Sequence, residues 1–289
     1  MISSRVAVAT CGELPDIDPD DAPLVASLAK RGITATPAVW DDPAVDWSQF
    51  DLTVIRSTWD YSRRREDFLA WAARTPRLAN PVAVLEWNTD KRYLEELSRA
   101  GASTTPTEWL VPGTPWDSPD AGQWVIKPTV GAGSIDTGRY DMSKAAEREL
   151  AHALIARLHG GGRHVMVQPY LSAVDEHGET ALMFFGGLYS HAIRKGPMLS
   201  GPYQDVAGLF QQEDIRPREA SAAELEVAEK ALAAIPLPDP LLYARVDLIP
   251  GPDGQPVLVE LELAEPSVFL RHDDAAGERF AAAVVAALR

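Results

Sequence analysis

Four charged side chains near the end of the chain have types and spacing that suit metal-dependent chemistry. The stretch YARVDLIPGPDGQPVLVELEL holds two runs typical of β-strands on either side of a Pro/Gly/Asp turn. Side chains alternate between the two faces of a strand, so Arg245 and Asp247 share one face, and Glu260 and Glu262 share one face of the second run. With the turn centred on its Asp-Gly pair, we expect Asp247 opposite Glu260 and Arg245 opposite Glu262.

Three carboxylates on one patch of sheet repel one another unless a cation or bound protons neutralise them. Oxygen ligands of this kind suit Mg²⁺, which binds one or two carboxylates and completes its shell with water and phosphate oxygens. The alternative is an exposed edge hairpin whose acidic side chains are only solvated. The apolar run AEPSVFL follows directly and favours a buried position.

A lysine at the end of a predicted strand, followed by a glycine-rich loop, is a second candidate site. The strand QWVIKP places Lys127 near its end, and the loop that follows contains Gly131, Gly133 and Ser134. Small residues let backbone N–H groups approach phosphate oxygens, and a lysine supplies positive charge. The GxxxxGK[ST] spacing of a Walker A loop is absent. The pattern indicates either a phosphate site or a mobile surface hairpin loop.

Another lysine, Lys91, falls in the first turn of a helix that we expect to begin near Asp90. Asn88 or Thr89 is the expected N-cap, and Gly101 ends the helix. The helix dipole does not favour a cation in this position, so Lys91 is notable but has no role on this ground alone.

The first quarter of the chain alternates as strand, helix, strand and strand (RVAVAT, DAPLVASLAK, ITATPAVW and DLTVIRS), which predicts a small Rossmann-like unit. Ligands of open α/β sheets bind at the carboxyl ends of strands. The last strand ends in RSTWDY, so we expect this motif to face a small polar substrate. The residues in this favoured position are Arg56, Ser57, Thr58, Trp59, Asp60 and Tyr61. The alternative is a loop in which Trp59 simply fills the core.

Composition restricts the class of partner. The net charge of −15 opposes binding to nucleic acid or to an anionic membrane surface. The single cysteine, Cys11, excludes an intrachain disulfide and suits a reducing cytosol. The N-terminus lacks the pattern of a signal peptide, and no apolar tract approaches the roughly 20 residues of a membrane span. We therefore expect a cytoplasmic protein that binds neither nucleic acid nor a membrane.

Taken in this order, the motifs resemble those of the ATP-grasp superfamily over essentially the whole chain, and the glutathione-synthetase-like branch most closely. The resemblance implies an α/β (α+β) fold that clasps ATP between two subdomains behind a Rossmann-like pre-ATP-grasp domain. The implied boundaries are 1–88 for the N-terminal domain, 89–170 for the small subdomain with the flexible glycine-rich loop, and 171–289 for the C-terminal subdomain with the Mg²⁺ site.

The resemblance also implies roles for individual residues. Lys91 and Lys127 stand where two lysines contact the nucleotide phosphates, and the loop with Gly131, Gly133 and Ser134 closes over them. The hinge strand that contacts adenine and the acid that binds the ribose correspond to Gln168, Pro169, Tyr170, Leu171 and Glu179. Two Mg²⁺ ions are expected on Asp247, Glu260 and Glu262, the last in a position where asparagine is commoner.

Within the superfamily, STWDY, GETALMFFGG, SHAIRK and ELELAEPS are similar to stretches of the O-ureido-D-serine cyclo-ligases, which close the ring of D-cycloserine. Such ligases tend to carry an arginine-bearing turn after the position of Lys195, whereas the corresponding GPMLSGPYQDVAG has no arginine. The implied reaction activates a carboxylate as an acyl phosphate for attack by an amine-type nucleophile, within one molecule in the cyclo-ligases. Arg245, or the pair Arg194 and Lys195, would stabilise the transferring phosphoryl group.

The resemblance further implies an amino-acid-like substrate, ATP and Mg²⁺, and a homodimer. Two alternatives stay open: a phosphotransferase on the same scaffold, and a nucleotide-binding protein without turnover. The lysines and paired metal carboxylates together disfavour the second, because a mere binder does not need both.

Overall fold

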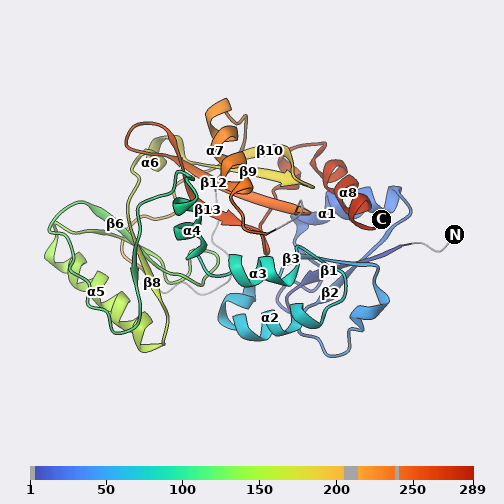
Figure 1. Cartoon of the computed structure of the whole chain (residues 1–289), viewed down its shortest axis with the longest axis horizontal. Coiled ribbons are helices and arrows are strands. Elements are labelled where there is room, and N and C mark those ends of the chain that lie inside the picture. The colour runs from blue at the N-terminus through green and yellow to red at the C-terminus, as the bar shows by residue number, and fades with distance from the viewer. Residues whose placement is uncertain (1–3, 205–213, 238–240) are drawn as a thin grey trace.

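The computed structural model describes residues 4–204, 214–237 and 241–289. The part of GPMLSGPYQDVAG from residue 205 onward lies outside the described residues. Three sheets, each built from a separate part of the chain, form the described structure (Figure 1).

The N-terminal sheet is parallel and has the strand order β2-β1-β3-β4. Apolar runs make β1 and β3 buried along nearly their whole length, as expected for parallel strands that are covered on both faces. Its strands are β1 (Arg5–Thr10), β2 (Thr34–Val39), β3 (Leu52–Ser57) and β4 (Leu78–Ala79). Its helical segments are η1 (Pro19–Asp21), α1 (Ala22–Lys30), η2 (Trp47–Gln49), η3 (Trp59–Arg63), α2 (Arg65–Arg74) and α3 (Val82–Asn88).

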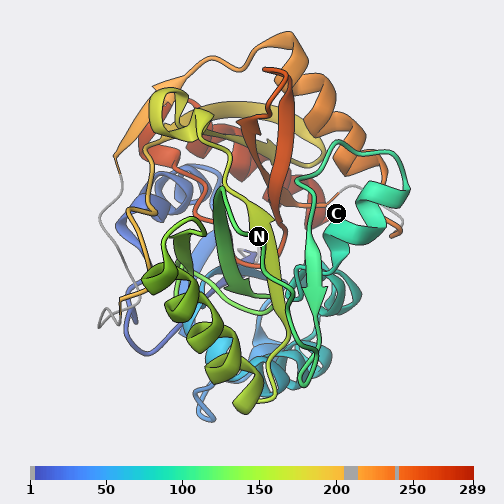
Figure 2. The same cartoon turned by 90° about the vertical axis from the view of Figure 1, so that its left-hand side faces the viewer.

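The middle sheet is antiparallel and has the order β5-β8-β6-β7. Helix α5 (Ala145–Gly160) lies across this sheet and buries Leu154, Ile155 and Leu158 against it (Figure 2). The strands are β5 (Glu108–Leu110), β6 (Gln123–Pro128), β7 (Gly138–Asp141) and β8 (Val165–Pro169), and helix α4 (Tyr93–Arg99) precedes them.

The C-terminal sheet has the order β11-β10-β9-β12-β13. Its strands are β9 (Glu179–Phe185), β10 (Leu188–Lys195), β11 (Ile215–Arg218), β12 (Tyr243–Pro250) and β13 (Pro256–Glu262). Its helical segments are α6 (Ala173–His177), α7 (Ala222–Ala233), η4 (Leu270–His272) and α8 (Ala276–Ala287). In the hairpin of β12 and β13, Arg245 pairs with Glu262 and Asp247 with Glu260, which confirms the expected register.

One hydrophobic core joins the N-terminal and C-terminal sheets. Val6 and Val54 of the first sheet belong to the same buried cluster as Met183 and Phe185 of β9 and Phe280 of α8. The rings of Phe185 and Phe280 are stacked with their centroids 4.4 Å apart. Helices α1 and α8 lie against each other, so the last helix closes onto the first (Figure 1). These two sheets therefore form one continuous support.

The three sheets fall within 1–88, 89–170 and 171–289, but whether these ranges are independent domains stays a prediction. Among the described residues, no helix is both long and apolar enough to cross a membrane.

The prediction that a helix begins near Asp90 is wrong. Helix α3 continues to Asn88, and α4 begins only at Tyr93, so Lys91 lies in the turn between them. Asn88 does not cap α4: its side-chain amide donates to the Leu261 carbonyl, and its side-chain oxygen accepts from the N–H of Leu263. These tertiary hydrogen bonds attach the turn to β13, and thereby place Lys91 beside the acidic hairpin.

Candidate active site

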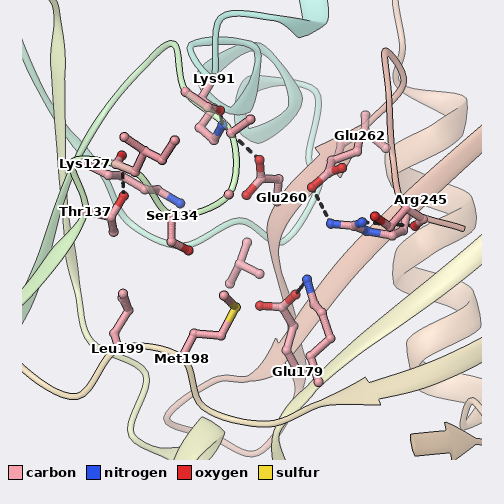
Figure 3. Close-up of a pocket in the computed structure, with 18 of the residues that line it drawn as sticks. Lys91, Lys127, Ser134, Thr137, Glu179, Met198, Leu199, Arg245, Glu260 and Glu262 are labelled. Carbon is pink, nitrogen blue, oxygen red and sulfur yellow. Dashed lines mark hydrogen bonds and ion pairs between the residues drawn. The ribbon is translucent and has the colours of Figure 1, made fainter. Parts of the chain in front are cut away.

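A cavity of about 820 Å³ lies where the three sheets meet, and most of the residues expected to form a site line it (Figure 3). These residues are Trp59, Lys91, Lys127, Gly131, Gly133, Ser134, Gln168, Pro169, Tyr170, Leu171, Glu179, Lys195, Arg245, Glu260 and Glu262. Residues more than 200 positions apart in the sequence are thus brought to one wall.

The charged wall is a network of ion pairs between the hairpin and neighbouring strands. Lys195 Nζ lies 2.8 Å from Asp247 Oδ2 and also pairs with Glu179. Arg245 Nε donates to Asp247 Oδ1 at 2.9 Å, and Arg245 Nη2 pairs with Glu262. Figure 3 shows the pairs of Glu179 and Glu262 on one side of the cavity. The cations hold several carboxylates close together.

Lys91 connects this wall to the glycine-rich loop. Its Nζ lies 2.9 Å from Glu260 Oε1 and donates to the Gly131 carbonyl at 2.7 Å (Figure 3). Burial opposes the charged form of both side chains. The Lys91 and Lys127 ammonium groups outweigh burial and hold the pKa of Glu260 below its usual range, while Glu260 raises the pKa of Lys91. Lys91 and Glu260 are therefore both charged at neutral pH.

Lys127 points into the same cavity, from β6 (Figure 3). Burial lowers its pKa, and among the described residues no carboxylate lies within ion-pair distance of its ammonium group. Next to it, Gly133 and Ser134 have φ angles of 60° and 57°, so the loop uses left-handed backbone. Asp136 anchors the loop through Arg157 and Arg163. A half-buried cation that pairs with no carboxylate of the described residues, beside a glycine-rich loop, suits an anionic ligand.

Asp247 lies behind the cavity wall and not on it. Its side chain is only 1% exposed, and both its oxygens accept hydrogen bonds from Arg245, with Lys195 on Oδ2. Burial would raise its pKa, but Arg245 and Lys195 hold it well below the usual range. Among the described residues, no three His, Cys, Asp or Glu side chains form a group that could hold a metal ion. The oxygens of Glu260 and Glu262 suit Mg²⁺, whereas Asp247 suits it only after a cation moves away.

Three carboxyl groups of the wall have raised pKa values. Burial, with the charge of Asp247 adding to it, raises the pKa of Glu179 to about 7. Burial and the charges of Glu260 and Asp247 raise that of Glu262 to about 7. Burial and the charge of Glu262 raise that of Glu265 to about 8. The wall therefore holds more negative charge than its lysines and arginine balance, and added cations or protons stabilise it.

These shifts predict that the protein without ligands loses stability as the pH rises from 6.5 to 8. Each of these acids has a folded pKa above its usual value of 4.5, so the native state binds more protons than the unfolded state in this window. Buried His191 has a lowered pKa and acts in the opposite direction, but its contribution falls away as the pH rises above the usual value of 6.5. We expect the Tm in thermal melts to fall by at least about 3 °C. A Tm that stays constant or rises over this pH window would contradict the raised pKa values of these three acids.

The structure corrects most of the expected substrate contacts of RSTWDY. Of its residues, Trp59 and Tyr61 line the cavity. Ser57 and Thr58 are fully buried, and Ser57 Oγ lies 2.8 Å from Thr10 Oγ1. Asp60 accepts a hydrogen bond from Trp40 Nε1 at 2.9 Å and pairs with an arginine of the next turn.

Two arginines expected at the site also lie elsewhere. Arg56 is 2% exposed, and its Nε lies 2.8 Å from Asp21 Oδ1, inside the core between the sheets. Arg194 points away from Lys195 because the side chains of a strand alternate; its Nε donates to the His177 carbonyl, and it does not line the cavity. Of the basic pair at the end of β10, the cavity wall therefore includes only Lys195.

Sequence reasoning missed residues at one end of the cavity. Asp18 and Asp20 line it from the loop before α1, and Asp20 accepts hydrogen bonds from the N–H groups of Leu270 and Arg271. Other missed lining residues are Asn88, Glu265, Ser267, Arg271 and His272. The one available signal was continuity with a motif already noticed, since Glu265 lies in AEPSVFL.

Known proteins that are similar to this chain include a D-cycloserine synthetase, matched in both sequence and structure. Residues 6–83 match the model of the N-terminal domain of D-cycloserine synthetase DcsG. The chain is 40% identical to the cycloserine biosynthesis protein DcsG of Streptomyces lavendulae, over 94% of this chain and 95% of that protein. A crystal structure of D-cycloserine synthetase DcsG covers 99% of this chain and 100% of its own, with 38% identity and a TM-score of 0.88.

Other solved structures share the fold. A D-alanine–D-alanine ligase from Bacillus anthracis has a TM-score of 0.67 at 15% identity, covering 99% of this chain and 97% of its own. The ATP-grasp ligase PsnB has a TM-score of 0.63 at 18% identity, covering 99% of this chain and 100% of its own. The chain belongs to the family of D-cycloserine synthetase DcsG, and is an enzyme of the ATP-grasp ligase fold.

Proposed function

We propose that this enzyme uses ATP to close a ring within a small amino-acid-like substrate, of the O-ureido-D-serine class. The observation that carries the proposal is the meeting of Lys91, Lys127 and the glycine-rich loop with Glu260 and Glu262 on one cavity. Cations and loop N–H groups suit a triphosphate, and carboxylate oxygens suit the Mg²⁺ that accompanies it. The relationship to DcsG supports the substrate class.

In this proposal the nucleotide lies along the cavity from β8 to the loop. Gln168 and Leu171 line the end expected to contact adenine, and Glu179 lies at the edge expected to take the ribose hydroxyls. Lys127 and Lys91 would meet the phosphates. Two Mg²⁺ ions would be held by Glu260 and Glu262, with Asp247 joining after Lys195 or Arg245 shifts. Bound Mg²⁺ supplies charge neutralisation for the phosphates.

The chemistry then needs no protein nucleophile. A substrate carboxylate oxygen attacks the γ-phosphorus and ADP leaves, which forms an acyl phosphate. The amine-type nitrogen of the same molecule attacks the acyl carbon, the C–O bond to phosphate breaks, and the nitrogen loses a proton. Arg245 and Lys195 carry positive charge to the wall where the carboxylate and phosphoryl groups would meet. Positioning and charge neutralisation account for most of the rate enhancement of such reactions.

The test is to incubate the enzyme with ATP, Mg²⁺ and O-ureido-D-serine and to measure ADP, phosphate and the cyclic product. We expect ADP and phosphate in equal amounts with the product, and much less turnover with D-serine, which lacks the internal nucleophile. A stable phosphorylated product without free phosphate would instead indicate a phosphotransferase. ATP binding without turnover of any amino acid would indicate a binding protein.

Lys127→Met is expected to weaken ATP binding about 10- to 100-fold. The substitution keeps an unbranched, half-buried side chain but removes the cation that lies next to the loop and pairs with no carboxylate in the described part of the chain. Loss of one charge-assisted hydrogen bond corresponds to about 1.5–3 kcal/mol. Calorimetric titration with a non-hydrolysable ATP analogue and Mg²⁺ measures the effect. Lys144→Met, at a lysine whose side chain is 60% exposed, is the matched control; equal affinities in the two variants would refute the role of Lys127.

The proposed setting is the cytosol, because the one cysteine, Cys11, is a buried free thiol that suits a reducing compartment. The homodimer expected from the resemblance stays a prediction, to be checked by light scattering of the purified protein.

A further inference from the structure

An irregular strap after β13, residues 264–268, is held by side chains at every one of its carbonyl groups. Tyr243 Oη donates to the Ala264 carbonyl at 2.8 Å, and Trp59 Nε1 donates to that of Glu265 at 3.0 Å. The next three carbonyls, of Pro266, Ser267 and Val268, interact with Arg56 Nη2 at 2.7 Å, Arg245 Nη1 at 3.1 Å and His191 Nε2 at 3.0 Å, respectively.

These partners come from β3, η3, β10 and β12, so four separate elements fix one short segment. Carbonyl groups outside regular structure need partners when they are buried, and side chains supply them here. A strap held at five successive positions has little freedom to shift. Any side chain that it presents to the cavity is therefore positioned before a ligand arrives.

Glu265 is the acidic side chain that this strap carries into the cavity. It is 7% exposed, and the Tyr61 hydroxyl hydrogen-bonds to its carboxylate. Glu179, Glu260 and Glu262 each pair with a lysine or arginine, whereas Glu265 has no ion pair among the described residues. A buried carboxylate with a purely structural role is normally paired with a cation. Glu265 faces the cavity and has no such ion pair among the described residues.

The groups around Glu265 leave it able to take up a proton near neutral pH. Tyr61 of η3 donates to it, Lys91 before α4 favours its charged form, and Glu260 and Glu262 of β13 disfavour that form. Tyr61 itself stays protonated because burial and the neighbouring carboxylates raise its pKa well above the usual value. A general base is most effective when its pKa lies near the working pH.

We infer that Glu265 is the general base of ring closure, accepting the proton of the attacking nitrogen. The inference rests on the proposed function. In this step the N–C bond forms, the C–O bond to phosphate breaks with its electron pair on the phosphate, and the N–H proton passes to the Glu265 carboxylate. The preceding transfer of phosphate to the substrate carboxylate moves no proton to the protein. Glu265 therefore acts in the second half-reaction and not in the first.

The test separates the two half-reactions. Hydroxylamine intercepts an acyl phosphate as a hydroxamate without needing a protein base, so trapping reports the first step, and the cyclic product reports both. In Glu265→Gln we expect trapping within about threefold of wild type, and ring closure slowed about 100- to 10,000-fold. The pH profile of kcat/KM should lose its acidic limb. Glu265→Asp should recover part of the rate, and Glu66→Gln, on the exposed face of α2, should match wild type.

Tyr61→Phe gives an independent measurement. The Tyr61 hydrogen bond lowers the pKa of Glu265, so its removal should move the acidic limb of the profile to higher pH. Equal loss of trapping and ring closure in Glu265→Gln would overturn the inference and make Glu265 a substrate-binding group. An unchanged pH profile in a folded, active Glu265→Gln would also overturn it. Failure of wild type to form either the hydroxamate or the cyclic product would refute the proposed function itself.

Discussion

Glu260→Gln is expected to lower kcat about 100- to 1000-fold, the effect of removing one charged group that acts on the transition state. The carboxylate pairs with Lys91, which in turn holds the Gly131 carbonyl of the glycine-rich loop. Glutamine keeps the shape but removes the charge, so it weakens the expected Mg²⁺ site and releases Lys91 from its ion pair. Initial rates of ADP release at saturating ATP and substrate measure the loss.

Stability should change little in this variant, because Glu260 lies on the cavity wall with its side chain 26% exposed. Added Mg²⁺ should not restore activity, because the substitution removes a carboxylate expected to bind Mg²⁺ and does not change the Mg²⁺ concentration. Glu229→Gln, on the exposed face of α7, is the matched control. Near-normal turnover of Glu260→Gln in a folded protein would remove the basis for placing Mg²⁺ on this hairpin.

Arg56→Met is expected to lower the free energy of unfolding by about 3–5 kcal/mol, the usual effect of removing one partner from a buried ion pair. Asp21 would be left as an unpaired carboxylate in the core, and the Pro266 carbonyl would lose its donor. The guanidinium also lies 5.5 Å from the ring centroid of Tyr243 and 5.6 Å from that of Phe280. Denaturant unfolding followed by circular dichroism measures the change.

The double variant Arg56→Met with Asp21→Leu distinguishes an ion pair from simple loss of packing. It leaves no unpaired charge, so it should recover a large part of the stability that the single variant loses. Affinity for an ATP analogue should stay near wild type in both, because neither Arg56 nor Asp21 lines the cavity. A loss of less than about 1 kcal/mol in the single variant would contradict a structural role, since exposed ion pairs contribute that little.

The acidic hairpin shows which parts of this protein local sequence can predict. Strand side chains alternate with a period of two, and a Pro/Gly/Asp turn sets the register, so the pairing of Arg245 with Glu262 and of Asp247 with Glu260 followed from the sequence and is confirmed. The ATP-grasp fold was implied by the resemblance of the ordered motifs to that superfamily, and the solved structures that share the fold confirm it. The N-terminal β-α-β-β pattern is confirmed by the order of β1, α1, β2 and β3.

RSTWDY shows where local reasoning failed. Its position at the carboxyl end of a strand was right, but alternation does not reveal what covers each face. Arg56 is buried because Asp21, 35 positions earlier, and Pro266, 210 positions later, converge on it. The same limit applies to Asp247, because local sequence does not reveal that Arg245 and Lys195 donate hydrogen bonds to its carboxylate oxygens.

The sequence by itself thus determined the first three strands, the hairpin register, the two lysines and the family. Only the tertiary structure decided which of the charged side chains face a common cavity and which lie buried in ion pairs. It also decided that the strap bearing Glu265 is held by Tyr243, Trp59, Arg56, Arg245 and His191. The physical reason is that a side chain's protonation and role depend on the partners that surround it, and these partners come from distant segments that only folding brings together.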